Sequence, residues 1–278
     1  MSESLGDSIE KKLNCNHGTG DELMLTFEKA FRSGYGKDSP NSHWDKPFFN
    51  NRDLAPKNRF VVWIDLMGAA NHMLFSLPKT ACFIGKIHEA GIQAKNKPLD
   101  VSIHPIADGF YAICDKWGVI SNYTARVMRS LAYCFETTDD NRYRFLVRAG
   151  IAYGRFVDGN QMTSGSNTFE DQNEYMRNVL VGCPLSWAYE AEHKAPPFGI
   201  YIDQSVTTHT EERVSWVLHR WWDDKKSQTD WAESFGSKIQ EYLEWLKINA
   251  IKTRYPIDKH DAYLRAIKEY FPARSSDA

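Results

Sequence analysis

The amino-acid sequence predicts a mixed α+β fold, with a mostly antiparallel sheet and helices on one of its faces. Short apolar runs bounded by turn formers indicate strands, and longer stretches with apolar residues at helical spacing indicate helices. Their order along the chain is that of a βαββαβ unit when the crossover connections are right-handed. Many unrelated activities use such a sheet, so the topology alone does not predict a function.

The elements of this unit can be assigned one after another. In chain order we predict a strand that starts at Arg59 and ends at Asp65, a helical stretch over 69–95, a hairpin of strands over 99–106 and 109–114, a helix that includes 119–134, a strand over 143–156, a helix that begins near Pro184, and a strand over 199–203. Pro78 lies inside the first helical stretch and predicts a kink or break there. A polar segment over 160–178 predicts a loop or projecting arm.

Two further parts flank the main domain. We divide the chain into an N-terminal part over 1–58, the main domain over 59–213 and a C-terminal extension over 214–278. The N-terminal part contains a predicted helix over 21–31 and a long irregular connection, of a kind that often covers a pocket or a partner. The Trp-rich extension shows two helical patterns, near 229–250 and 258–271. We predict that it packs over the main domain or at a contact between two copies.

Composition and charge exclude several classes of function. The 278 residues carry a net charge of -2 with a pI near 6.5, which gives no bulk electrostatic reason to expect binding to nucleic acid or to a membrane surface. We find no signal-peptide pattern and no apolar run long enough to span a membrane, so we expect a cytoplasmic protein. The five cysteines are odd in number and lack a CxxC pair, which indicates reduced thiols rather than disulfides or a zinc site.

Asp65 is the residue that needs an explanation, because it ends a strand that should be buried on both faces. An ionised group beside an apolar run costs several kcal/mol unless something compensates it, and a divalent cation is the strongest compensator. The alternative is a carboxylate that caps the helix expected to begin near Gly68.

Asp108 lies in the turn of the predicted hairpin and offers a second carboxylate. In a βαββ arrangement this turn can meet the end of the first strand, and two close carboxylates are favourable when cations lie between them. Oxygen ligands select Mg²⁺ or Mn²⁺, which usually act on phosphates. Met67, Gly68 and Ala69 form a strand-to-helix turn whose amides could bind a triphosphate. Alternatively, Asp108 is an ordinary turn residue, since Asp-Gly is a common hairpin signal.

The sequence also resembles a known family. Blocks at 60–68, 103–110, 147–154 and 181–190 are similar in order and spacing to those of the class III nucleotidyl cyclases, and the strand at 199–203 also fits. The resemblance implies a ferredoxin-like cyclase domain that forms a homodimer with two active sites across the interface. It also implies that Asp65, Leu66 and Asp108 bind the metal ions.

This chain departs from the family at positions that matter for substrate binding and catalysis. Typical adenylate and guanylate cyclases carry a base-reading Lys or Glu where this chain has His104, and a transition-state Asn and Arg where it has Ser186 and Glu190. His104 and Ser186 are our candidates for substrate contacts, although both residue types have ordinary structural roles in a strand and in a first helical turn. Loss of the Arg removes charge stabilisation, so the domain is either inactive or uses another cation.

Four arginines could replace the missing cation, namely Arg144, Arg148, Arg155 and Arg177. We take Arg148 and Arg155 as the catalytic candidates. Each could instead be a solvated basic side chain, and Arg148 could belong to a structural ion pair.

The departures are similar to those of the bacterial pyrimidine cyclases of Pycsar antiphage systems. That resemblance implies conversion of UTP or CTP to the 3′,5′-cyclic monophosphate and pyrophosphate, and a product that activates a separate effector. Aromatic residues at Trp44, Tyr153, Trp187 and Tyr189 could narrow a pyrimidine pocket, or could belong to the core or the dimer interface. Our leading hypothesis is a uridylate cyclase that depends on Mg²⁺ or Mn²⁺. A cytidylate cyclase, a purine cyclase and a non-catalytic binding module remain alternatives.

Overall fold

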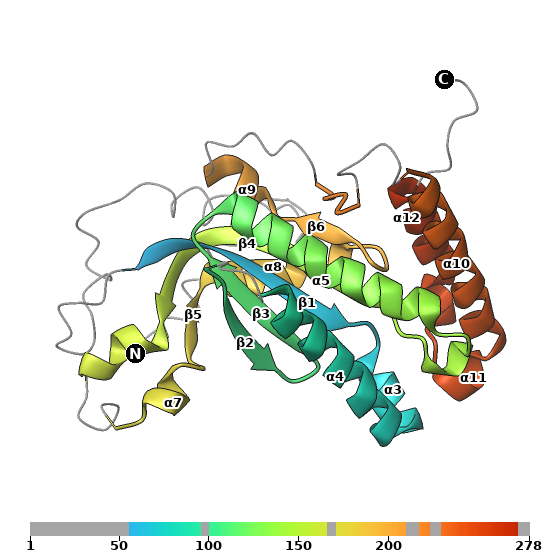
Figure 1. The fold of residues 1–278 in the computed structure, drawn as a ribbon, viewed down its shortest axis with the longest axis horizontal. Helices are drawn as coiled ribbons and strands as arrows, with labels where there is room; N and C mark the ends of the chain where they lie inside the picture. The colour runs from blue at the N-terminus through green and yellow to red at the C-terminus, as the bar shows by residue number, and fades with distance from the viewer. Residues whose placement is uncertain (1–55, 96–99, 166–170, 210–216, 223–228, 272–278) are drawn as a thin grey trace, which may run out of the picture. The chain divides into compact units, whose positions relative to one another are not determined.

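The computed structural model describes the chain over 56–95, 100–165, 171–209, 217–222 and 229–271 (Figure 1). These residues all belong to one compact unit within Pro47–Ala278, and Met1–Lys46 lies outside the described residues. The helix predicted over 21–31 and almost all of the irregular connection before the first strand lie outside the described residues. So does the predicted boundary near 213, and the division at 58 and 213 therefore stays a prediction.

One sheet forms the centre of the described unit, with the strand order β2-β3-β1-β4-β5 and with β6 beside β4 (Figure 1). Its strands are β1 (Lys57–Leu66), β2 (Ser102–Ile106), β3 (Gly109–Cys114), β4 (Val147–Asp158), β5 (Leu180–Gly182) and β6 (Ile200–Ile202). The central strand β1 is antiparallel to both of its neighbours, β3 and β4, whereas β4 and β6 are parallel. The α+β fold and the βαββαβ order are therefore confirmed.

Helices connect these strands, and the longer ones lie in the predicted places, whereas two short ones lie in the segment over 160–178 that was predicted as a loop or projecting arm. The helices are α3 (Ala69–Phe75), α4 (Leu77–Ala94), α5 (Trp117–Thr137), α7 (Asn173–Met176), α8 (Cys183–Lys194), α9 (Gln204–His209), α10 (Thr229–Ile248), α11 (Ala250–Thr253) and α12 (His260–Tyr270), with short 3₁₀ helices η1 (Asn141–Tyr143), η2 (Gly159–Gly165) and η4 (Ile257–Lys259). The break predicted by Pro78 is confirmed, because Ser76 separates α3 from α4 and Pro78 lies in the first turn of α4.

The strand predicted over 143–156 begins later than the sequence pattern indicates. Asp140 accepts a hydrogen bond from the Arg142 amide (2.8 Å) and starts the 3₁₀ helix η1, so the strand begins at Val147. Phe145 and Leu146 are buried although they precede the strand. Because they are buried, they continue the apolar pattern of β4 toward the N-terminus, and the pattern alone does not show where the strand begins.

Helices cover both faces of the sheet, which corrects the prediction of helices on one face. Side chains alternate along β1, so Val62 and Ile64 face the layer of α4 and α5, whereas Val61 and Trp63 face α8. Both sets are apolar, so each face needs a covering layer. Gly150 on β4 allows α8 to lie close, since a Cβ there would overlap the Ala188 carbonyl and the Glu192 amide.

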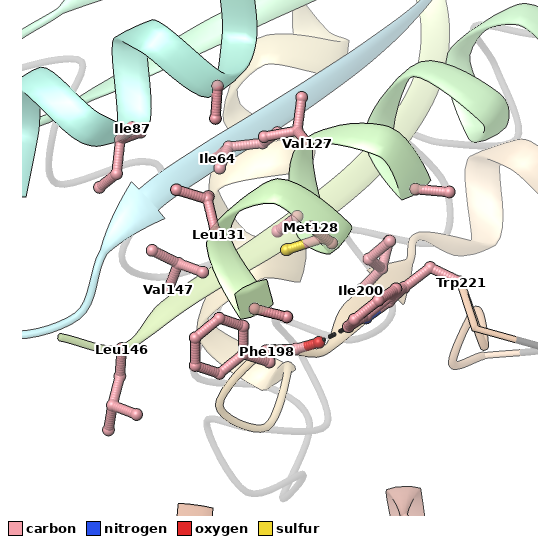
Figure 2. Packing of buried hydrophobic residues seen from close by; sticks show 14 of the residues in the cluster. Ile64, Ile87, Val127, Met128, Leu131, Leu146, Val147, Phe198, Ile200 and Trp221 are labelled. Atoms are coloured by element: carbon pink, nitrogen blue, oxygen red, sulfur yellow. Dashed lines mark hydrogen bonds between the residues drawn. The ribbon is translucent and has the colours of Figure 1, made fainter. Parts of the chain in front are cut away.

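The C-terminal helices pack onto the main domain, as the sequence analysis predicted. Phe235 of α10 and Trp221 are buried in the same apolar cluster as Phe135 and Phe198. Figure 2 shows Trp221 beside Ile200, with the indole donating a hydrogen bond to the Phe198 carbonyl (2.8 Å). In Figure 1, α10 and α12 lie together at the C-terminal end of α5. No helix in the described part of the chain is both long and apolar enough to cross a bilayer.

Candidate active site

Asp65 lies one residue before the end of β1 and faces α8. Its partner in the pairing of β1 with β4 is Arg148, and the preceding residue, Ile64, pairs with Phe110 at the start of β3. Because side chains alternate, Asp65 shares a face with Trp63. The helix-cap alternative is wrong, since Gly68 is the N-cap of α3 and no side chain caps that helix.

Asp108 lies at the same end of the sheet, in the turn between β2 and β3. The turn packs closely against β1, because a Cβ on Gly109 would overlap the Ile64 carbonyl. The charge of Asp108 contributes to the raised pKa of Asp65. The structure thus brings the two predicted carboxylates together, and their role as metal ligands stays a prediction.

Glu192 is a third carboxylate at this position, and it is not among the residues predicted from the sequence. It lies on α8 with no exposed surface. Burial, then the charges of Glu192 and Asp108, raises the pKa of Asp65 to about 7. A signal was present in the sequence, because Glu192 follows Ala188 by four positions and so lies on the apolar face of the helix.

Arg148 partly balances these acids. Its Nε donates to Glu192 Oε1 (2.6 Å) and a terminal nitrogen donates to the His193 carbonyl (3.3 Å). Burial raises the pKa of Glu192, while Arg148 and His193 oppose that rise. The contact with Glu192 is the structural ion pair that was the alternative for Arg148, and the catalytic role of Arg148 stays a prediction.

The donor set at this end of the sheet fits a hard divalent cation. Asp65 and Asp108 supply carboxylate oxygens, Leu66 follows Asp65 directly and offers a backbone carbonyl, and Glu192 adds negative charge. Within the described ranges, no three His, Cys, Asp or Glu side chains gather in a way that could hold a metal ion. Protein groups alone would therefore leave coordination positions open, as Mg²⁺ sites do when phosphates and water complete them.

The turn after Asp65 has a defined hydrogen-bond pattern. The Met67 amide donates to the Leu146 carbonyl (2.9 Å), so this amide is already used. Gly68 has a left-handed conformation with φ of 72°, and its carbonyl accepts from the Asn71 amide (3.0 Å) as α3 begins. The amides of Gly68 and Ala69 remain the candidates for phosphate contacts.

His104 belongs to a row of ring side chains on the face of the sheet toward α8. In the strand register His104 pairs with Tyr111, which pairs with Trp63, and the Trp63 and Tyr111 rings are 4.5 Å apart between centroids. His104 Nε2 and Trp63 Nε1 are buried without a hydrogen-bond partner among the described residues. Burial lowers the pKa of His104, so its ring is neutral at pH 7. Two orphaned polar atoms in one row are a feature of a site that a polar ligand completes.

Some of the predicted site residues do not lie near Asp65 and Asp108. Arg155 pairs with Asn58 and lies seven positions along β4 from Arg148, a separation of roughly 23 Å. Ser186 is exposed on α8 and so points away from its own sheet. Tyr153 packs against Phe60 on the opposite face, and cannot narrow a pocket beside Trp63.

The remaining candidates also have defined positions or lie outside the structure. Arg144 donates from Nε to the Thr138 carbonyl (2.9 Å) and covers the Phe135 ring, which is a structural role. Arg177 is exposed, Trp187 is in the apolar cluster under α8, and Tyr189 is about half exposed. Trp44 lies outside the described residues.

Comparison with solved structures finds cyclases. The chain is similar to an adenylate/guanylate cyclase/hydrolase from Silicibacter pomeroyi (18% identity, 58% of this chain and 83% of that chain, TM-score 0.40). It is also similar to the guanylyl cyclase Cya2 (13%, 58% and 82%, TM-score 0.45). A third is the guanylate cyclase domain of RhGC from Catenaria anguillulae in complex with GTP (14%, 56% and 83%, TM-score 0.40).

No family model and no curated protein matches the sequence. The structural scores describe a partial likeness of fold at low identity, and neither a reaction nor a substrate follows from them.

Proposed function

We propose that this chain is a nucleotidyl cyclase that converts UTP to 3′,5′-cyclic UMP and pyrophosphate. The observation that carries the proposal is the convergence of Asp65 and Asp108, with Glu192 close by, at one end of the sheet. Such a surplus of carboxylate is stabilised by divalent cations, and substrate phosphates complete their coordination. Bound Mg²⁺ or Mn²⁺ supplies activation of the attacking hydroxyl and charge neutralisation on the leaving group.

The reaction is an internal displacement at the α-phosphorus. The bond from O3′ to the α-phosphorus forms, the bond to the pyrophosphate oxygen breaks, and the 3′-hydroxyl proton passes to solvent. In this scheme Asp65, Asp108 and the Leu66 carbonyl hold the cations, and the amides of Gly68 and Ala69 bind phosphate. Arg148 is the cation nearest to these acids and orients the charged groups beside Asp65.

The base lies against the row of Trp63, Tyr111 and His104. The orphaned Trp63 indole is a donor, and His104 Nε2 is an acceptor because the ring donates its proton to the Arg177 backbone, so the pair suits the mixed carbonyl and N–H edge of a pyrimidine. The resemblance to pyrimidine cyclases favours UTP, with CTP and the purine triphosphates as alternatives.

The active enzyme is proposed to be a homodimer. Ser186 is exposed on α8 and Arg155 lies at the far end of β4, so either residue could contact a substrate only at the site of a second copy. In the proposed biological role the cyclic product leaves the enzyme and activates a separate effector during phage defence.

Incubation with each of the four nucleoside triphosphates and Mg²⁺ or Mn²⁺ tests the proposal. We expect a cyclic monophosphate from UTP, identified by mass, and loss of product when the metal is chelated. Asp65→Asn and Asp108→Asn should lower turnover by at least about 10²-fold, because each removes charge that holds the cations. Asp100→Asn is the matched control, since Asp100 is an exposed acid that lines a separate cavity with Lys57 and Arg59, at the start of β1. Near-normal turnover of either active-site variant would exclude this mechanism.

A non-catalytic nucleotide-binding module is the second candidate. It is favoured by the ion pair of Arg148 with Glu192, which leaves the nearest cation already engaged. The same incubation separates the two, because a binding module retains nucleotide and releases no pyrophosphate from any of the four substrates.

A further inference from the structure

A cavity of about 480 Å³ lies between the main domain and the C-terminal helices. One side is formed by the turn after β1 and the start of β4, and includes Met67, Gly68 and Arg148. The other side is formed by the segment from α11 to α12, and includes Arg254, Lys259 and Tyr263. In Figure 1, α11 lies beside α3, which follows this turn. The cavity therefore joins the C-terminal extension to the end of the sheet that carries Asp65.

The cavity begins where the candidate active site ends. Arg148 lines it and is also the cross-strand partner of Asp65. Met67 and Gly68 line it and follow Asp65 by two and three positions along the chain. A ligand whose reacting end lies at Asp65 can therefore extend past this turn into the cavity.

The charge of the lining favours an anion. Arg148, Arg254 and Lys259 contribute cations, and none of the residues that line the cavity is Asp or Glu. Arg148 is offset by Glu192, whereas neither Arg254 nor Lys259 forms an ion pair in the part of the chain that the structure describes. Two exposed cations thus line the cavity and can donate to a ligand there, and phosphate oxygens are strong acceptors for such donors.

The backbone holds Arg254 in a fixed position at the edge of the cavity. Arg254 ends α11 in a left-handed conformation, with φ of 54° and ψ of 33°, and its amide donates to the Ala250 carbonyl. Asn or Gly adopts this conformation at lower cost than Arg. The residue type is therefore not explained by the turn that it makes.

We propose that this cavity binds the phosphate tail of the nucleoside triphosphate, and that Arg254 and Lys259 of the C-terminal extension contact it. The inference rests on the proposed function, because it assigns the substrate of the same site. It gives the extension a direct part in substrate binding, in addition to its packing on the core. It also supplies cations to a site where Arg148 is already paired.

Binding of inorganic tripolyphosphate to the full-length chain, measured by titration calorimetry without divalent cations, tests the proposal. The variant combines Arg254→Asn, which tolerates the left-handed turn, with Lys259→Gln. The matched control combines Arg265→Asn with Lys268→Gln, since both residues are exposed on α12 and neither lines the cavity. We expect at least about tenfold weaker binding in the first variant and less than about twofold change in the control.

The turnover of the same variants separates the two proposals. In an active cyclase, the first variant should raise KM for the triphosphate by about tenfold with little change in kcat. Unchanged tripolyphosphate binding and KM in an active cyclase would overturn the cavity assignment alone. Weaker tripolyphosphate binding in a chain that forms no cyclic product from any triphosphate would support the anion site and reject the cyclase. Two triphosphates bound per chain would overturn the assignment to the substrate's own tail.

Discussion

At the scale of single residues, the end of β1 concentrates acids in a half-buried position. Burial and the charges of Glu192 and Asp108 raise the pKa of Asp65, burial also raises the pKa of Glu192, and Arg148 offsets only part of both effects. The pKa of Asp65 near 7 follows from burial first and from the neighbouring carboxylates second. A bound cation would therefore stabilise the ionised carboxylates of this site more than it would stabilise an exposed pair of acids.

His72 provides a residue-scale prediction about pH. Burial, with a smaller effect of Lys79, lowers its pKa to about 4, and its ring lies edge-on to Phe83. An unfolded chain binds a proton at this residue near pH 6.5, so protonation favours unfolding as the pH falls from 7 toward 4. At pH 5 the lost stability is about 1–2 kcal/mol.

Chemical denaturation at pH 7, 6 and 5 measures this effect. His72→Gln should show a smaller fall in the free energy of unfolding between pH 7 and pH 5 than the unchanged chain. An equal fall in both proteins would show that His72 does not stay neutral in the folded state.

The sequence could predict Asp65 and Asp108 because each interrupts a recognisable pattern, a buried strand and a hairpin. It could not predict the row of His104, Tyr111 and Trp63, because that row depends on the register of three strands that only the folded sheet fixes. Glu192 is harder to predict, because Glu190 lies two positions earlier on the same helix and only the packing of α8 on the sheet buries one of the two while leaving the other exposed.

At the scale of elements, a proline made one helix boundary predictable from the sequence, whereas a contact that depends on a glycine was not predictable. The boundary between α3 and α4 was predictable from Pro78, because proline in a helix interior lacks a donor and clashes with the preceding turn. The position of α8 on the opposite face of the sheet from α4 and α5 was not predictable from the sequence of α8 alone. Its close packing depends on Gly150 of β4. The start of β4 was misplaced because buried residues before it carry the same apolar pattern as strand residues.

Gly150→Ala tests the contact between α8 and the sheet. The added methyl group would overlap backbone atoms of α8, which cannot move as a flexible side chain can. We expect the free energy of unfolding to fall by about 2–3 kcal/mol, measured by urea denaturation. Gly85→Ala on α4 is the control, because open space surrounds that position and alanine favours a helix by up to about 1 kcal/mol. Similar stabilities for the two variants would contradict the close packing of α8.

At the scale of the whole described unit, the C-terminal helices belong to the same core as the sheet. Phe235 packs edge-to-face with Phe135 and Phe198, and the Tyr242 hydroxyl donates to the Arg144 carbonyl (2.8 Å). Lys238 forms an ion pair with Glu136 at the end of α5. The sequence predicted helices here from their periodicity, but which surface they cover depends on contacts between residues far apart in the chain.

Phe235→Ala should therefore destabilise the sheet together with the extension. A buried Phe replaced by Ala loses about 3–5 kcal/mol, and a shared core unfolds in one transition. Circular dichroism and tryptophan fluorescence should report the same lowered midpoint in a denaturant titration. Ile251→Ala is the control, since that side chain is 96% exposed and should change stability by less than about 0.5 kcal/mol. Separate transitions for the two signals would mean that the extension unfolds independently.

The pairing of β1 with β4 gives every residue from Lys57 to Leu66 a partner on the neighbouring strand. A shift of the register by one residue would exchange the two faces of β1. The Asp65 side chain would then point into the apolar layer beneath α4, and the apolar residues next to it would point toward α8. A shifted register is thus unfavourable along the whole strand and not only at its acidic end. The carboxylates should therefore stay together as long as the sheet is folded, with or without a ligand, and should separate only when the sheet unfolds.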